Sequence, residues 1–161
     1  MKAEYHSSIA IMVFSQAPEG SVTTTSVDRK IAMPLDKAWS LLSDFTRSPC
    51  PAFPVIVHEM GDPKYNGVGT IRTIKLGIFS AMERLEAVEL NRSYMYCILS
   101  GSPVKQYLGK FEFSDENGST FIRWHADFKP KFPLTGWVIA IVTKKMVHKI
   151  LDQMEADHQS A

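Results

Sequence analysis

Cysteine is scarce in this 161-residue sequence, and neither cysteine nor histidine is arranged as a metal ligand. The two cysteines, Cys50 and Cys97, show no metal-ligand spacing, and no two of the five histidines do. We therefore expect no metal and no other cofactor. A disulfide between the two cysteines stays open, although reduced thiols in a cytosolic protein are the simpler interpretation. Cys50 lies between two prolines without an obvious base, which argues against a cysteine nucleophile.

An excess of charge of one sign is also missing, and so are long apolar runs. The 18 Lys and Arg residues nearly balance the 17 Asp and Glu residues, which leaves a net charge of +1. This balance gives no electrostatic case for a nucleic-acid partner or for an anionic membrane. No stretch approaches the roughly 18 apolar residues that span a bilayer, so we expect no transmembrane segment. These absences favour a soluble, cytoplasmic protein, and the sequence does not indicate its oligomeric state.

The first 21 residues differ from the rest of the chain. Residues 9–14 form an apolar run behind Lys2, and residues 15–17 loosely resemble a cleavage site. The run is shorter than a typical signal core, and Pro18 would follow the cut. We interpret residues 1–21 as an N-terminal extension, either a tail or an extra strand, with a secretory signal as the alternative. Residues 22–158 then form one domain, long enough for a substantial core.

Within that domain, short β-branched or apolar segments alternate with turn residues. Pro34 opens a short helix after the first strand, because proline suits the first helical turn. Three further prolines at positions 49, 51 and 54 indicate a second short helix that is broken, or a loop in its place. The later connections are too short for crossover helices, which makes the sheet antiparallel. The expected strands are 22–32, 55–60, 68–76, 79–89, 93–100, 104–113 and 119–128, and a long helix covers 134–158.

The long C-terminal helix is expected to bury one stripe of apolar residues. The stripe recurs every four residues, at Val138, Val142, Met146, Ile150 and Met154. The order of elements predicts an α+β helix-grip fold. In this fold a curved antiparallel sheet of about seven strands wraps around the long helix, and two short helices follow the first strand.

One predicted hairpin brings an arginine opposite a glutamate. If residues 77–78 form a two-residue loop, Leu76 pairs with Phe79 and Arg72 falls opposite Glu83. Burying charges costs free energy unless they neutralise each other, so we expect the pair to have a structural or a functional role. We interpret it as a structural clasp between two strands or as a group that orients a ligand. Because side chains on one face repeat every second residue, the same face carries Ile74, Leu85, Ala87, Tyr96 and Ile98.

Several short motifs follow one another across about residues 22–154. They are Ile31-x-x-Pro34 with Ala38-Trp39 and Asp44-Phe45, Gly67-x-Gly69-x-x-Arg72, Glu83-Arg84-Leu85-Glu86, Tyr94-x-Tyr96, and Thr120-x-x-x-Trp124-x-x-x-Phe128. In this order and spacing, the chain resembles the START-like helix-grip superfamily (SRPBCC), specifically its polyketide cyclase/dehydrase and lipid-transport branch. The resemblance implies a cavity between the sheet and the long helix that holds a hydrophobic small molecule.

The resemblance says less about activity, because cyclases, lipid carriers, hormone receptors and pollen allergens share this fold. The Glu-Arg-Leu-Asp block of plant abscisic-acid receptors is similar to residues 83–86. The gate and the latch of those receptors are replaced here by unrelated residues at 75–79 and 102–105. Hormone reception by that mechanism is therefore not expected.

Given such a cavity, the apolar faces of the strands should line it, because side chains alternate along a strand. Tyr96 and Tyr107 would offer hydroxyls to the cavity, or would simply pack in an aromatic core. His58 is the one histidine expected in the interior. The candidate ligand-binding residues are Arg72, Ile74, Glu83, Leu85, Tyr96, Ile98, Tyr107, Phe111, Trp124 and Phe128, with Trp137 and Ile141 closing the cavity from the helix.

Three functions fit these features, and the first is favoured. The protein binds a hydrophobic small molecule, such as a lipid, a polyketide or an aromatic metabolite, with the cavity mouth at the loops around Phe53, Gly77 and Pro103. Alternatively, it is a protein-interaction module whose cavity has collapsed. In the remaining alternative, it is a polyketide cyclase or dehydratase that uses three residues to orient the substrate and assist proton transfer, namely Arg72, Glu83 and Tyr107.

Overall fold

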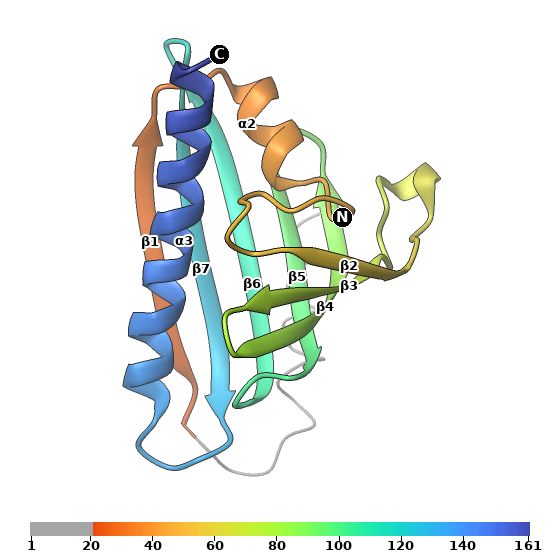
Figure 1. The fold of residues 1–161 in the computed structure, drawn as a ribbon, viewed down its shortest axis with the longest axis vertical. Helices are drawn as coiled ribbons and strands as arrows, with labels where there is room; N and C mark the ends of the chain where they lie inside the picture. Colours follow the sequence, from red (N-terminus) through yellow and green to blue (C-terminus); the bar gives the residue numbers. More distant parts are fainter. Residues whose placement is uncertain (1–20) are drawn as a thin grey trace, which may run out of the picture.

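The computed structural model describes residues 21–161, which form a curved seven-stranded sheet with a long helix across it (Figure 1). The strands pair antiparallel in the order β1-β7-β6-β5-β4-β3-β2. This architecture confirms the predicted α+β helix-grip fold. The predicted extension lies, apart from residue 21, outside the described residues. The elements are β1 Thr23–Ile31, α2 Leu35–Leu42, β2 Val55–Glu59, η1 Pro63–Tyr65, β3 Ile71–Leu76, β4 Phe79–Glu89, β5 Ser93–Ser100, β6 Val104–Glu116, β7 Ser119–Pro130 and α3 Gly136–Gln159.

One short α-helix follows β1, instead of the two that the sequence suggested. It begins after Pro34, whose φ of −60° suits the entry to a helix. The helix buries Ala38, Trp39 and Leu42. The chain then runs through turns and bends over residues 43–54. The three prolines of this stretch lack the amide hydrogen that a second helix would need, so the loop interpretation is the correct one.

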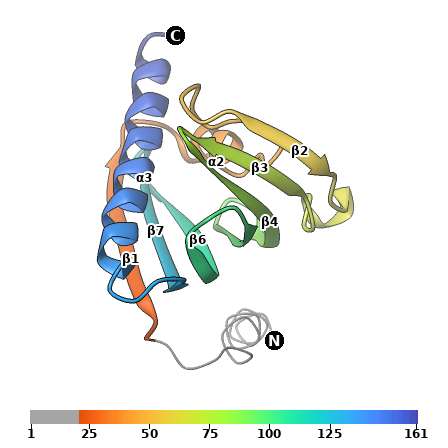
Figure 2. The same cartoon turned by 60° about the horizontal axis from the view of Figure 1, so that its bottom comes forward.

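The sheet bends strongly between its two ends. Figure 2 shows β1, β7 and α3 together on one side, while β2, β3 and β4 turn away from them on the other. The helix α3 contacts mainly β1 and β7. It therefore covers only one side of the concave face, and a cavity remains beside β3 to β6.

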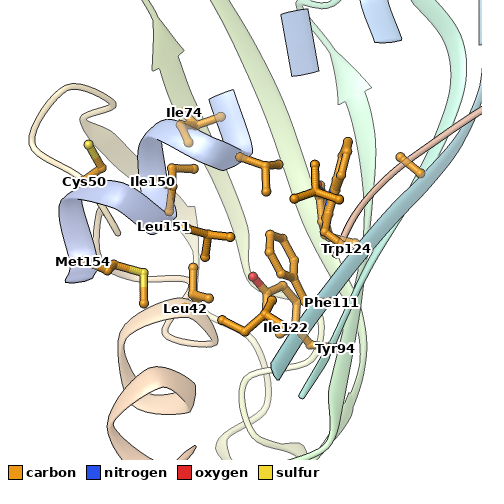
Figure 3. Close-up of a cluster of buried hydrophobic side chains, with 14 of the residues drawn as sticks. Leu42, Cys50, Ile74, Tyr94, Phe111, Ile122, Trp124, Ile150, Leu151 and Met154 are labelled. Atoms are coloured by element: carbon orange, nitrogen blue, oxygen red, sulfur yellow. Dashed lines mark hydrogen bonds between the residues drawn. The ribbon is translucent and has the colours of Figure 1, made fainter. Parts of the chain in front are cut away.

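The two halves of α3 differ in burial. In the C-terminal half, Leu151 and Met154 are buried and face Leu42 of α2 (Figure 3). In the N-terminal half, Val138 and Val142 are 42% and 50% exposed. The prediction of one continuous buried stripe is therefore wrong for its first two positions. These two side chains border the cavity instead of meeting packed neighbours.

The β3–β4 hairpin has the register that the sequence predicted. Leu76 pairs with Phe79, and Arg72 pairs with Glu83. Gly77 has a φ of 69°, in the left-handed region that glycine enters without steric cost. The turn therefore fixes which side chains of the two strands meet.

A β-bulge in β4 changes which side chains share its inner face. Leu85 pairs with Tyr96, but Ala87 pairs with Met95, so the residue between them has no partner. This insertion turns Ala87 to the outer face, where it forms a small cluster with Met95 and Leu108. The prediction that Ala87 shares the face of Arg72 is therefore wrong.

Candidate functional site

A cavity of about 360 Å³ lies between the inner face of the sheet and the N-terminal half of α3. Strands β3 to β7 supply its wall, and Phe53 and Pro103 border it from two loops. The open cavity disagrees with the alternative of a collapsed interaction module. Its volume falls at the lower end of the range of about 300–1,000 Å³ that small-molecule sites occupy.

The structure brings most of the predicted ligand-binding residues together around this cavity. Eight of the twelve border it, because alternation along β3 to β7 points them to the concave side. These eight are Arg72, Ile74, Glu83, Tyr96, Ile98, Tyr107, Phe111 and Trp124.

The other four predicted residues lie elsewhere. Leu85 and Phe128 are 1% and 0% exposed, but they do not border the cavity. Phe128 lies beside Tyr107 in the neighbouring strand, with its ring centroid 6.0 Å from that of Tyr107. Trp137 and Ile141 are 67% and 46% exposed and lie on the outer side of α3, so they do not close the cavity.

Sequence reasoning missed several residues that do border the cavity. Tyr94 is one of them, and its spacing of two from Tyr96 was a signal that could have identified it. On α3, the four-residue spacing of apolar residues was such a signal, because it directed the stripe that begins with Val138 toward the sheet. From the helix, the cavity is bordered by Val138, Ile139, Val142, Thr143, Met146, Val147 and Ile150.

Arg72 and Glu83 form a buried ion pair at the cavity wall. The Nε of Arg72 donates to Oε2 of Glu83 at 2.9 Å, and the residues are 6% and 7% exposed. The guanidinium also lies over the ring of Phe45, with 3.7 Å from Cζ to the ring centroid. Its Nη1 is buried without a hydrogen-bond partner. One face of the arginine is thus fixed, while one of its donors is unused.

Two tyrosine hydroxyls and an indole form a second polar group on the wall. Nε1 of Trp124 donates to Oη of Tyr96 at 3.1 Å, and this oxygen lies 3.3 Å from Oη of Tyr107. Only one of the two hydroxyl hydrogens can lie between the two oxygens. The other hydrogen is therefore free to be donated elsewhere.

These tyrosines remain uncharged over the ordinary pH range. Burial raises the pKa of Tyr96 to about 12, and the negative charge of Glu83 acts in the same direction. Burial also raises the pKa of Tyr94 and Tyr107 well above the usual value of 10.0. The hydroxyls can thus act as hydrogen-bond donors, while a phenolate base at neutral pH is disfavoured.

Neither cysteine forms a reactive centre with a neighbouring base. Both are buried free thiols. Burial raises the pKa of Cys97 to about 12, and its Sγ donates to Oε1 of Glu86 at 2.8 Å. A thiol that remains protonated is a poor nucleophile.

His58 is exposed, with Nε2 2.8 Å from Oγ1 of Thr73, so the prediction of an interior histidine is wrong. The register of β2 against β3 shifts between Val57 and Glu59, which gives His58 no partner in the ladder. Among residues 21–161, no group of three or more His, Cys, Asp or Glu side chains could hold a metal ion. In the same part of the chain, no helix has the length and apolar character needed to cross a bilayer.

Comparison with protein families identifies the chain. The model of a family described as polyketide cyclase / dehydrase and lipid transport matches residues 21–159. The chain belongs to this family. Its family and its fold together make it a START-like module for hydrophobic ligands. The comparison with curated proteins gives no match.

Several solved structures share the fold of this chain. A START superfamily protein from Mycobacterium smegmatis has a TM-score of 0.71 at 14% identity, covering 86% of this chain and 99% of its own. The protein XoxI from Bacillus cereus has a TM-score of 0.69 at 19% identity, covering 84% and 94%. A norcoclaurine synthase mutant from Thalictrum, in complex with a transition-state analogue, has a TM-score of 0.67 at 15% identity, covering 89% and 99%. At these identities, the likeness concerns the fold alone.

Proposed function

We propose that the protein binds one compact hydrophobic molecule in the cavity between the sheet and α3. The observation that carries the proposal is the mainly apolar cavity of about 360 Å³ with the polar side chains of Arg72, Tyr96 and Tyr107 in its wall. Apolar walls with a few convergent polar groups are typical of small-molecule sites. The proposed contacts are Arg72, Ile74, Glu83, Tyr96, Ile98, Tyr107, Phe111 and Trp124, together with the cavity side of α3.

The chemistry of the wall favours a ligand with an oxygen that accepts hydrogen bonds. Nη1 of Arg72 and one tyrosine hydrogen are unused donors. The charge of Arg72 is already balanced by Glu83, 2.9 Å away, so a second anion would be poorly compensated. We therefore propose a neutral ligand, such as an aromatic or polyketide-like molecule with a carbonyl group.

Filling the cavity mouth should weaken ligand binding without unfolding the protein. Val142 borders the cavity and is 50% exposed, so a larger side chain there enters the cavity at little cost to the fold. We expect Val142→Trp to weaken the binding of Nile red, a neutral dye with a carbonyl oxygen, by about tenfold or more. A fluorescence titration of the purified protein measures this change.

The control for this variant is Lys144→Trp. Lys144 is exposed on the same helix and does not border the cavity, so this change adds the same ring outside the proposed site. The proposal predicts that Lys144→Trp binds the dye like the unaltered protein. Equal binding by all three proteins would mean that the dye does not occupy the cavity.

A pair of nearly isosteric probes tests the preference for an acceptor oxygen. 2-Acetylnaphthalene carries a carbonyl that 2-ethylnaphthalene lacks, and the two have similar size. A hydrogen bond from the arginine should make the ketone bind about tenfold more tightly. Calorimetric titrations of both probes measure the ratio, with 2-naphthoate as the anionic comparison. Tighter binding of the naphthoate would reject a neutral ligand, and equal binding of ketone and hydrocarbon would reject the donor role of Arg72.

The second candidate function is a polyketide cyclase or dehydratase. The observation that favours it is the pair of tyrosine hydroxyls on the cavity wall, Tyr96 and Tyr107 with 3.3 Å between their oxygens, because such donors can stabilise an enolate oxygen. Glu83 would then assist proton transfer from its place on the wall. Turnover of a polyketide-like ketone that is lost in Tyr107→Phe, while Nile red binding persists, would favour this candidate over simple binding.

A cytoplasmic location is also part of the proposal. Both thiols of the described chain, Cys50 and Cys97, are free, which is the state that the reducing cytoplasm maintains.

A further inference from the structure

Exposed apolar side chains that no neighbour within the described chain covers lie at the same end of the molecule as the cavity mouth. They come from the β3–β4 hairpin, from the loop between β7 and α3, and from the first turns of α3. We call this set the mouth patch; it consists of Ile78, Phe79, Phe132, Leu134, Trp137 and Ile141, which are 92%, 61%, 62%, 90%, 67% and 46% exposed. Exposed apolar groups gathered in one place usually mark a contact surface.

Specific contacts hold the segments of the mouth patch at the same end of the molecule. The amide of Lys131, in the loop before α3, donates to the carbonyl of Pro103 at 2.9 Å. Gly101 lies directly against the backbone of Ser80, where an added Cβ would come within 2.3 Å of the carbonyl oxygen. Figure 1 shows the β5–β6 and β7–α3 connections at this same end.

The backbone conformation of Leu134 indicates that the exposure of the mouth patch has a function. It has a φ of 63°, in the left-handed region that residues other than glycine and asparagine rarely adopt. The side chain held in this way is 90% exposed. An unfavourable backbone conformation that presents an apolar side chain to water is an outlier that points to a function.

The charge around the patch has one sign, although the whole chain is nearly neutral. The three sequence segments that carry or adjoin the mouth patch, residues 70–82, 99–111 and 129–151, contain no aspartate or glutamate, and Glu83, which follows the first segment, is paired with Arg72 in the interior. Each of them contains lysine. The net charge of +1 therefore conceals a separation of charge, with the basic groups gathered where the apolar ones are. This combination is complementary to an anionic lipid surface.

The outer side of α3 has the spacing that a bilayer interface requires. Trp137 and Ile141 lie near its N-terminal tip, and Lys144 and Lys145 follow on the same side. At 1.5 Å per residue, the lysines are about 11 Å from Trp137 along the axis. With this tip directed at the bilayer and Trp137 in the interface, the long side chains of the lysines would reach the lipid head groups.

We propose that the mouth patch docks the protein onto the surface of an anionic lipid bilayer, with the cavity mouth against the membrane. Trp137 and Leu134 enter the interface, and Lys144 and Lys145 bind the head groups. The contact is peripheral. It does not depend on which molecule occupies the cavity, so it can fail while the proposed ligand binding holds.

The test is sedimentation of the full chain with vesicles. Vesicles of equal parts phosphatidylcholine and phosphatidylglycerol should carry the protein down, and high salt or pure phosphatidylcholine should release most of it. The double variant Leu134→Asn/Trp137→Gln should lower the partition coefficient about tenfold. Asparagine tolerates the left-handed conformation at position 134, so this variant preserves the fold. Lys144→Gln/Lys145→Gln should lower the partition coefficient about thirtyfold on the anionic vesicles.

Matched controls change similar residues away from the mouth. Leu90 and Tyr65 are 62% and 58% exposed, and Leu90 follows the end of β4 opposite to the hairpin. Leu90→Asn/Tyr65→Gln and Lys37→Gln/Lys64→Gln should bind vesicles like the unaltered protein.

Three results would overturn the proposal. The first is the absence of binding to either vesicle type. The second is binding that survives Leu134→Asn/Trp137→Gln, which would place the contact elsewhere, for example in the apolar run at residues 9–14. The third is a dimer in vesicle-free solution that dissociates in the same variant, together with no vesicle binding, because a second copy would then cover the patch.

Discussion

Replacing Glu83 with glutamine should destabilise the protein by about 3–5 kcal/mol, because it leaves the charge of a buried arginine without a partner. The replacement keeps the shape of the side chain and an oxygen that can still accept from Nε of Arg72. Both residues are less than a tenth exposed, so water cannot replace the lost carboxylate charge. For a domain of this size, the melting temperature should fall by about 10 °C. Thermal unfolding followed by circular dichroism measures the change.

An exposed ion pair in the same sheet provides the control. Arg123 and Asp28 pair across β7 and β1 at 3.0 Å, with side chains 53% and 47% exposed. Asp28→Asn should leave the melting temperature almost unchanged, as is usual for surface pairs. An equal effect of Asp28→Asn and Glu83→Gln would show that burial does not set the strength of the central pair.

The buried ion pair of Arg72 and Glu83 also shows what could be predicted from the sequence. The position of Gly77 and the alternation on both sides of it determine the hairpin register, so Arg72 could be placed opposite Glu83. The order of motifs then identified the fold, because each strand and the long helix leave a periodic pattern that extends over many residues. Features encoded by such long patterns were predictable.

Features that depend on one inserted residue were not predictable. The bulge in β4 turns Ala87 outward. The insertion reverses the alternation beyond it, so a prediction that is correct before the bulge is inverted after it. No residue type in β4 indicates where the bulge occurs.

The side of α3 that faces the cavity was predicted only in part, because Trp137 and Ile141 were placed at the cavity together with the stripe of Val138. Apolar residues surround its first turns, so both the stripe of Val138 and the stripe of Trp137 could be assigned to the interior. The packing of the C-terminal half against the sheet sets the rotation of the whole helix and brings Val142 to the cavity. Trp137 and Ile141, which the sequence placed at the cavity, lie on the outer side instead, where we propose that they contact a membrane surface.

Gly109→Ala should have the second large effect, because the polar end of the cavity is built directly over this glycine. Gly109 pairs with Tyr96 across β5 and β6. A Cβ at position 109 would lie 2.4 Å from Cζ and 2.7 Å from the hydroxyl of Tyr96, which is closer than atoms can approach. The ring must therefore move away from the strand and into the cavity.

Moving the ring breaks the hydrogen bond from Trp124 and narrows the site. We expect the free energy of unfolding to fall by about 2–4 kcal/mol, because the site is overpacked and the buried indole donor is left without a partner. The displaced ring also occupies part of the cavity of about 360 Å³, so we expect Nile red to bind at least about tenfold more weakly. Thermal unfolding and the dye titration measure the two effects on the same sample.

A double-mutant cycle attributes both effects to this one contact. Tyr96→Ala removes the ring, and in that background Gly109→Ala should no longer destabilise the strand. It should stabilise it by about 0.5–1 kcal/mol, the usual gain of alanine over glycine inside a regular element. The sign of the effect at position 109 would thus reverse with the residue at position 96. A cost that persists without the ring would mean that the strand itself, and not the tyrosine over it, requires glycine.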